Sequence, residues 1–420
     1  MNLMVIGGGG REHAIVTFLA KNKEVGDIYV LPGNAGTAKI AKNIAIAATD
    51  IMGMVEFAKN NAIDFAFVAP DDPLVLGAVD ALTEIGIPCF GPNKAAAIIE
   101  GSKAFSKDLM KRYSIPTASF EVFDDYLKAL EYIEKKDTYP IVIKADGLSL
   151  GKGVTIAKDY VEAKTALGSV MKDRVFGASG DKVVIEEFLE GPEVSALCFC
   201  DGNVIKPMVS SMDHKAIYEG NKGPNTGGMG AVAPNSYYTE EIAKRCMNEI
   251  FIPTMNAMNK EGRTFKGCLY FGLMITKEGP KVIEYNCRFG DPETEVVLPL
   301  LETDLFTIVK AVAEGRLSEV EVKNKKGFAC CVVLASGGYP TKYETGYEID
   351  FSSLELDDNS YIFHAGTKEL DGKIVTSGGR VLAVTAVDAS GAREARKKAY
   401  DMVEKIQFKD MYYRKDIGNM

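Results

Sequence analysis

The sequence predicts a multidomain protein of the α/β and α+β classes, in which an N-terminal doubly wound parallel sheet precedes two further units. In the first hundred residues, short apolar strands alternate with helical patterns, which is typical of a parallel sheet covered by helices. The length of 420 residues predicts about three domains. The pattern changes after residue 100, and the charged stretch from Glu319 to Lys326 is typical of a linker. We therefore expect domains at 1–100, 101–322 and 323–420.

The first unit is expected to be Rossmann-like and to bind substrate. Its glycine run, Gly7 to Gly10, follows a strand and opens a helix, so its backbone N–H groups could approach an anion. The sixth residue from Gly7 is Glu12 rather than glycine, which favours a small phosphate over NAD. Gly10 is one candidate contact, and Asn34, after the second strand, is another, although plain turns would also explain both loops. Strands are expected at 2–6, 27–31, 65–68 and 88–90, and helices at 11–21, 50–60 and 75–85.

The second unit contains a glycine-rich loop, Gly147 to Gly153, with a strand on either side. It is not a Walker A loop, because three residues rather than four precede Gly151-Lys152 and no helix follows. It predicts a flexible flap over phosphates, with Lys144 reaching them from the preceding strand; an exposed hairpin without a ligand is the simpler alternative. We expect a mobile lid subdomain at about 118–189. Strands are expected at 141–146, 154–157 and 182–188, with helices at 101–113, 250–259 and 299–316.

A strand near residue 285 carries the most informative pattern. Period 2 places Ile283, Tyr285 and Cys287 on an apolar face and Glu284, Asn286 and Arg288 on the opposite face, roughly 7 Å apart at each step. Two hard oxygen ligands beside a cation suit Mg²⁺ held against nucleotide phosphates, with the arginine at the group being transferred. The simpler interpretation is that these residues form the polar face of an edge strand. The glycine-rich flap upstream makes this interpretation less favoured.

Two further segments of the second unit are candidates for ligand contacts. The connector from Ile185 through Leu189 to Glu193 can present backbone groups to an adenine edge and a carboxylate to ribose hydroxyls. Asp213-His214-Lys215 precedes a glycine-rich stretch, Asn225 to Gly230, within an expected long loop at 203–235. No serine elbow accompanies this histidine, so an anion-binding loop fits better than a catalytic triad, and His214 could be merely structural.

The third unit is predicted to be a small α+β domain. Its strands are expected at 327–335, 360–366, 374–376 and 380–387, and its helix at 392–406.

Composition excludes several classes of protein. The net charge of −9 argues against a nucleic-acid partner, and no run approaches 18 apolar residues, so we expect no membrane span. None of the eight cysteines forms a C-x-x-C pair, which argues against structural zinc and for a reducing compartment. We expect a cytoplasmic protein without a signal peptide.

Taken together, the flap, the upstream lysine, the connector and the E-x-N strand resemble the ATP-grasp superfamily. More closely, the chain resembles the phosphoribosylamine–glycine ligase family. The resemblance rests on the stretches at 9–14, 32–37, 101–105, 144–154, 223–231, 283–293, 363–367 and 414–418, in the family's order. Asp71 stands where the family usually has glutamate, and Ala216, Glu219 and Asn221 replace an arginine and aspartates. These departures leave open which side chains contact the amine substrate.

The resemblance implies ligation of glycine to 5-phosphoribosylamine, with ATP and Mg²⁺ (or Mn²⁺), through a glycyl phosphate, in a cytoplasmic enzyme expected to be a monomer. It implies metal ligands Glu284 and Asn286, and catalytic roles for Arg288 and Lys144. Rival readings are another ATP-grasp ligase using formate or bicarbonate, an NAD-binding dehydrogenase, and a nucleotide sensor without turnover. The implied ATP contacts are Lys103, Lys144, Gly151, Gly153, Glu186, Glu187, Leu189 and Glu193. The implied substrate contacts are Gly10, Asn34, Asp213, Lys215, Asn225, Thr226, Gly227, Gly228, Met229 and Arg288.

Overall fold

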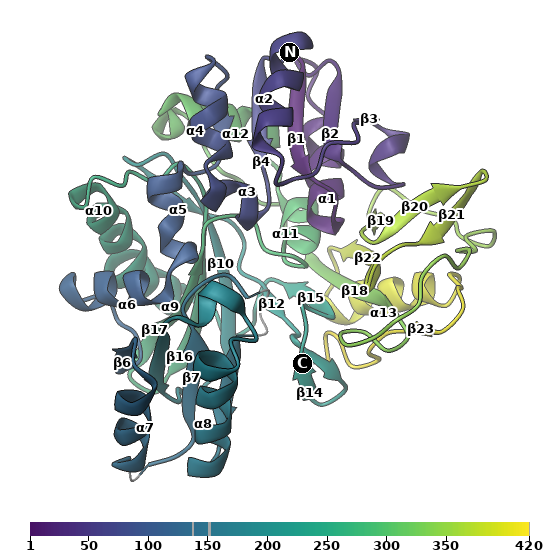
Figure 1. The fold of residues 1–420 in the computed structure, drawn as a ribbon. Helices are drawn as coiled ribbons and strands as arrows, with labels where there is room; N and C mark the ends of the chain where they lie inside the picture. Colours follow the sequence, from purple (N-terminus) through teal and green to yellow (C-terminus); the bar gives the residue numbers. More distant parts are fainter. Residues whose placement is uncertain (137, 150–152, 420) are drawn as a thin grey trace.

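The computed structural model describes residues 1–136, 138–149 and 153–419. The chain forms an N-terminal lobe, a central region with a protruding lid, and a C-terminal lobe, and these parts surround a common centre (Figure 1). The predicted order, a parallel sheet followed by α+β units, is confirmed.

The N-terminal lobe is built on a five-stranded parallel sheet. Its elements are β1 (Leu3–Gly7), α1 (Gly10–Leu19), β2 (Ile28–Pro32), β3 (Lys42–Asn43), α2 (Ile51–Asn60), β4 (Phe65–Val68), α3 (Asp71–Leu76), α4 (Ala78–Glu84) and β5 (Cys89–Phe90). The strand order is β3-β2-β1-β4-β5, with β1 paired in parallel to β2 and β4. The single helix expected at 75–85 is wrong: Gly77, at a φ of +98°, separates α3 from α4.

Two capped helices lead from this lobe into the lid. They are α5 (Lys94–Gly101), which the sequence analysis missed, and α6 (Lys103–Arg112). Asn93 and Ser102 cap these helices, since each side-chain oxygen accepts a hydrogen bond from an N–H group of the first turn.

The lid sheet has the order β6-β9-β7-β8 and its strands pair antiparallel. Its elements are β6 (Phe120–Phe123), α7 (Tyr126–Glu134), β7 (Ile141–Ala145), β8 (Val154–Ala157), α8 (Tyr160–Leu167) and β9 (Val183–Glu187).

The central sheet carries the predicted metal strand at its edge. It consists of β10 (Glu193–Cys200), β11 (Ile205–Pro207), β16 (Gly267–Thr276) and β17 (Gly279–Asn286), in the order β11-β10-β16-β17. The strands pair antiparallel, and β10 and β11 form a hairpin around Asp201-Gly202, a dipeptide typical of such turns. Helices α9 (Glu240–Arg245) and α10 (Ile252–Lys260) precede β16 in the chain.

A bulge in β17 overturns part of the predicted alternation. Gly272 of β16 lies opposite Glu284, but the next residue, Leu273, lies opposite Val282, so Ile283 is the extra residue. Val282 is therefore fully buried, whereas Ile283, expected in the core, lines the cleft described below. The bulge is invisible in the sequence because it depends on the register with β16.

The helix expected at 299–316 is also wrong in extent. The structure has α11 (Thr294–Leu300) and α12 (Leu305–Glu314) instead. Pro299 lies within α11, which ends one residue later, and Asp304 begins the next helix by accepting a hydrogen bond from the Thr307 N–H.

The C-terminal lobe takes two strands from the segment expected as a long loop. They are β12 (Met212–Asp213) and β15 (Gly230–Ala233), which join β18 (Phe328–Ser336), β22 (Arg380–Asp388) and β19 (Ser360–His364) in the order β12-β15-β18-β22-β19. The expectation of an irregular loop at 203–235 is therefore wrong. The segment also contains the hairpin of β13 (Ala216–Tyr218) and β14 (Lys222–Asn225). The lobe is completed by β20 (Thr367–Leu370), β21 (Lys373–Thr376), α13 (Ala392–Val403) and β23 (Met411–Tyr412).

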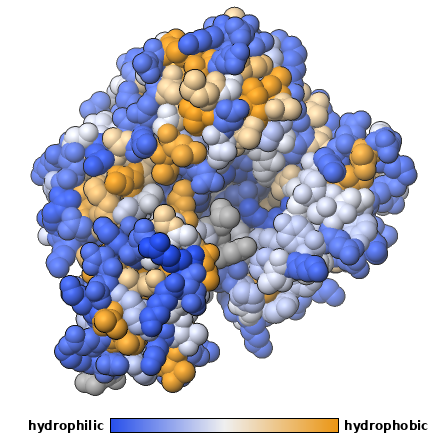
Figure 2. Space-filling view, in the orientation of Figure 1, coloured by the Kyte–Doolittle hydropathy of each residue, from blue (hydrophilic) through white to orange (hydrophobic). Residues whose placement is uncertain are grey.

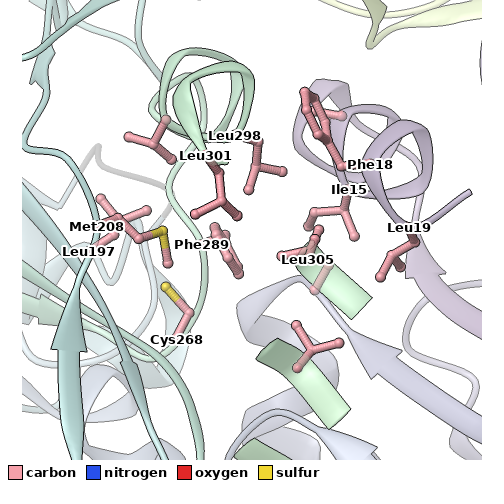
Figure 3. Packing of buried hydrophobic residues seen from close by; sticks show 14 of the residues in the cluster. Ile15, Phe18, Leu19, Leu197, Met208, Cys268, Phe289, Leu298, Leu301 and Leu305 are labelled. Atoms are coloured by element: carbon pink, nitrogen blue, oxygen red, sulfur yellow. The ribbon is translucent and has the colours of Figure 1, made fainter. Parts of the chain in front are cut away.

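One apolar cluster joins the lobes. Ile15 and Leu19 of α1 lie toward Leu298 of α11 and Leu305 of α12, and Phe289 lies between these helices and the central sheet (Figure 3). All these side chains are buried. Because this closely packed cluster crosses the lobe boundaries, it holds the lobes together around their common centre.

The eight cysteines are buried and unpaired, and no described helix is long and apolar enough to cross a membrane.

Candidate active site

A cavity of about 540 Å³ lies where the lobes and the lid meet. Figure 2 shows this face of the molecule hollowed between the lobes, with hydrophilic residues gathered in the hollow. Fifteen predicted site residues line this cleft. They are Lys103, Lys144, Gly153, Glu186, Glu187, Leu189, Glu193, Asp213, Lys215, Asn225, Thr226, Gly227, Glu284, Asn286 and Arg288.

Glu284 and Asn286, the residues predicted as metal ligands, lie at the end of β17 and line the cleft. Burial acts to raise the pKa of Glu284, but nearby cations, Lys215 first among them at 3.7 Å, outweigh burial and lower it. Glu284 is therefore ionised at neutral pH. The described residues contain no cluster of three or more His, Cys, Asp or Glu suited to a metal ion. An ionised carboxylate and an amide oxygen fit Mg²⁺, which usually takes few protein ligands beside substrate phosphates.

Lysines surround this end of the cleft. The Lys103 Nζ donates to the Gly147 carbonyl at 2.9 Å, and the Lys144 Nζ donates to the Ile283 carbonyl at 3.0 Å. Lys144 also forms an ion pair with Glu186 at 2.9 Å. The hydrogen bond from Lys103 connects Gly147, the first residue of the predicted flap, to α6. The predicted contact Gly151 lies outside the described residues.

Sequence reasoning missed Lys107. Its Nζ lies 2.8 Å from the Glu186 carboxylate, so Glu186 is held between two buried lysines. Burial lowers the pKa of Lys107 to about 8, although Glu186 opposes this shift. Its spacing of four residues from Lys103, on the same face of one helix, was the available signal.

The connector after β9 lines another part of the cleft. Glu187 accepts a hydrogen bond from the Ser119 N–H at 2.9 Å, and Glu193 pairs with Lys215 at 3.1 Å. Apolar side chains complete this part, as an adenine ring requires. They are Val142, Ile156, Phe188, Leu189 and Met274.

Arg288 follows β17 and lies in the wall of the cleft. Its Nη2 contacts Glu100 at 2.9 Å and donates to the Asn286 amide oxygen at 3.1 Å, while its Nη1 donates to the Phe289 carbonyl at 3.3 Å. Asp71 is farther away, at 3.9 Å. Burial acts against the charge, but Glu100 and Asp71 raise the pKa of Arg288. These contacts hold the guanidinium beside Asn286, one of the two predicted metal ligands.

The predicted substrate loop is only partly in the cleft. Asp213, Lys215 and the residues from Asn225 to Gly227 line it. Gly228 does not, and its N–H donates to the Thr226 hydroxyl. Met229 is fully buried in an apolar cluster outside the cleft lining.

The unusual residues after Lys215 face the C-terminal segment rather than the cleft. Asn221 accepts a hydrogen bond from Arg414 at 3.1 Å, and Glu219 accepts one from the Lys415 N–H at 3.2 Å. The Ala216 carbonyl also accepts from Arg414. The side chains of Glu219 and Asn221 therefore help to anchor the β13–β14 hairpin on the C-terminal segment.

Gly10 and Asn34 lie outside the cleft lining. The N–H of Gly9, at the start of α1, is bonded to the Glu12 carboxylate at 2.6 Å. Asn34 donates to the His364 carbonyl at 2.7 Å and accepts from the Gly36 N–H, so it connects the N-terminal and C-terminal lobes.

Several cleft residues had no predicted role. Arg11 lies within the stretch at 9–14, Glu100 directly precedes the stretch at 101–105, and Asp291 and Glu293 lie within the run that follows Arg288. Arg380 had no sequence signal, because it reaches Asp291 at 3.0 Å only through the pairing of distant strands. These five residues line the cleft.

Three models of phosphoribosylglycinamide synthetase match the chain. The N domain matches residues 1–100, the ATP-grasp (A) domain matches 101–294 and the C domain matches 329–420. Among curated proteins, the phosphoribosylamine–glycine ligases of Caldanaerobacter subterraneus subsp. tengcongensis and Clostridium acetobutylicum are 49% and 50% identical, each over 100% of this chain and 99% of their own.

Solved structures agree. The crystal structure of phosphoribosylamine–glycine ligase from Thermotoga maritima has a TM-score of 0.87 and 35% identity, covering 99% of this chain and 100% of that one. The biotin carboxylase domain of the Hydrogenobacter thermophilus 2-oxoglutarate carboxylase, at 15% identity, covers 98% of this chain and 91% of its own with a TM-score of 0.77, and shares the fold. With these matches along its length, the chain belongs to the phosphoribosylglycinamide synthetase family, the phosphoribosylamine–glycine ligases.

Proposed function

We propose that the cleft joins glycine to 5-phosphoribosylamine, using ATP, to give glycinamide ribonucleotide, ADP and phosphate through a glycyl phosphate. The chain is an ATP-dependent ligase of the ATP-grasp type that acts in purine biosynthesis. The observation that carries the proposal is the placement of Glu284, Asn286 and Arg288 beside Lys103 and Lys144 in one cleft of a chain of this family.

Activation of glycine is the first step. A carboxylate is a poor electrophile, so the glycine carboxylate first attacks the γ-phosphate of ATP and ADP leaves. Arg288 orients either the transferred phosphoryl group or the glycine carboxylate, since its planar fork can grip two oxygens. Lys103 and Lys144 offset phosphate charge. A divalent cation held by Glu284 and Asn286, which we propose to be Mg²⁺ (or Mn²⁺), supplies further charge neutralisation when bound.

Ligation is the second step. The amine attacks the glycyl carbon and phosphate leaves, so no protein nucleophile is needed, and positioning with exclusion of water carries most of the effect. We propose that the apolar wall around Leu189 holds adenine, and that Glu187 or Glu193 bonds the ribose hydroxyls. The loop with Lys215 and Asn225 to Gly227 is proposed to hold the amine substrate.

Other features remain proposals of the same kind. We propose domain boundaries at 100/101 and 322/323, a lid at about 118–189, a monomeric state and a cytoplasmic location. Gly10, Asn34, Gly228 and Met229 are proposed to support the substrate site from outside the cleft lining.

Release of ADP and phosphate tests the function. Purified protein with MgATP should release both only when glycine and 5-phosphoribosylamine are present together, and glycinamide ribonucleotide should accumulate in equal amount. Replacement of glycine by formate or bicarbonate should abolish product. Equal turnover with either acid would refute the choice of glycine, and ATP binding without turnover would refute the assignment as a ligase.

A further inference from the structure

The carboxylates that line the cleft are nearly all engaged by partners. Asp71, Glu100 and Glu187 accept backbone N–H groups, and Glu293 accepts hydroxyl groups from Ser195 and Tyr270 at 3.0 Å. Others are held in ion pairs or belong to the proposed metal site. These are Glu186 with Lys107 and Lys144, Glu193 with Lys215, Asp291 with Arg380, and Glu284.

Asp213 is the exception among the described carboxylates of the cleft. Its Oδ1 is buried and makes no hydrogen bond, and its carboxylate forms no ion pair. The backbone around it is fixed, because β12 pairs with β15 and places Asp213 opposite Ala231. A Cβ at Gly228 would lie 2.7 Å from this Oδ1, so glycine at that position leaves room for the carboxylate.

Charges of both signs face Asp213 from the elements around it. They are Glu193 at the start of β10, Lys215 in its own segment, Glu293 before α11, and Arg380 of β22. Burial and then Glu293 raise the pKa of Asp213 well above its usual range, while Lys215 and Arg380 act in the opposite direction. A carboxylate in these surroundings takes up a proton more readily than an exposed one.

Asp213 also lies close to the reacting groups. Lys215, two residues along the chain, reaches Glu193 at 3.1 Å and Glu284 at 3.7 Å, and Asp213 lines the same cleft as these three residues. It is on the side that carries Asn225 to Gly227, where we place the amine. The reaction still requires a group that accepts the proton of the attacking amine, and a carboxylate without a hydrogen bond or ion pair can fill this role.

We propose that Asp213 accepts the proton that the amine of 5-phosphoribosylamine loses when it attacks the glycyl phosphate. In this step the new N–C bond forms, the bond between the glycyl carbon and the phosphate oxygen breaks, and the electron pair leaves with phosphate. One proton passes from nitrogen to the Asp213 carboxylate and then to solvent. The proposal rests on the function proposed above.

The two half-reactions separate this role from substrate binding. Scrambling of ¹⁸O from the β,γ-bridge of labelled ATP in the presence of glycine reports formation of glycyl phosphate without any amine. In Asp213→Asn, this scrambling should stay within about threefold of wild type, whereas ligation should fall by roughly 10²–10⁴-fold. The acidic limb of the wild-type pH profile of kcat should be absent from the variant. Asp401→Asn, the same change in an exposed ion pair on α13, should alter neither readout.

Two results would contradict the role proposed for Asp213. Full ligation by Asp213→Asn would overturn the proposal, and so would loss of scrambling with a raised KM for glycine, which would place Asp213 in the glycine site. If Asp213→Asn does not fold, Asp213→Ala is measured with added formate, which must restore ligation if a carboxylate base is missing. Failure of wild type to release phosphate in the presence of both glycine and 5-phosphoribosylamine would instead refute the proposed function.

Discussion

Arg288→Lys tests whether the guanidinium fork is needed for the reaction. The arginine contacts three acceptors at 2.9–3.3 Å, namely Glu100, Asn286 and the Phe289 carbonyl. A single Lys ammonium keeps the charge but cannot reproduce this planar arrangement. Loss of one preorganised donor is worth ~2.7–4 kcal/mol, so turnover should fall roughly 10²–10³-fold. The contact with buried Glu100 should also be weakened, which lowers stability by about 1.5–3 kcal/mol.

Steady-state kinetics and thermal melting on the same preparation provide the assay. A fall in kcat with unchanged KM values would assign Arg288 to the transferred phosphoryl group, whereas a selective rise in the KM for glycine would assign it to the glycine carboxylate. Arg112→Lys, at an exposed ion pair on α6, is the matched control and should leave turnover unchanged. Turnover of the Arg288 variant within about threefold of wild type would refute the reasoning.

Three further predictions concern ionisable side chains. Glu284→Gln keeps the shape of a proposed metal ligand but removes its charge, so turnover at saturating Mg²⁺ should fall on the order of 10²-fold while ATP binding, measured by calorimetry, weakens only modestly. Lys107→Met leaves Glu186 with Lys144 as its single cation, so the KM for ATP should rise; an unchanged KM would contradict a positioning role for Lys107. Glu295 is fully buried without a hydrogen-bond partner, and burial raises its pKa, so its contribution to stability is greatest below about pH 4.3 and declines as pH rises through the folded pKa. The melting temperature of Glu295→Gln relative to wild type should therefore increase with pH, and a difference independent of pH would contradict this prediction.

Much of the fold follows from local patterns. The parallel N-terminal sheet and the β10–β11 hairpin were predictable because strand alternation and turn residues are encoded within a few neighbouring positions. The predictions that were wrong concern elements whose structure depends on strands far along the chain. The bulge at Ile283 requires the register with β16, and the role of residues 230–233 as a strand requires β18, about a hundred residues later.

The same distinction holds for the cleft. Lys144, Glu284 and Asn286 belong to short motifs, so sequence analysis found them. Arg380 was missed because the folding of the C-terminal sheet alone brings it to Asp291. Residues 216–221 could be identified as unusual, but only the contacts with Arg414 show that they anchor a hairpin.

The C-terminal sheet combines strands from two distant parts of the chain, β12 and β15 with β18, β22 and β19. This arrangement determines the order in which the sheets can form during synthesis on the ribosome. All strands of the lid sheet lie within residues 120–187, so the sheet can fold while the remainder of the chain is still being made. β15, in contrast, pairs with β12 along one edge but must wait for β18 before its other edge is paired. The segment that carries Asp213 and Asn225 to Gly227 therefore stays exposed to chaperones until translation has passed β18, which ends at residue 336. We expect a nascent chain stalled before β18 to bind ATP analogues weakly and to be cleaved by protease in this segment.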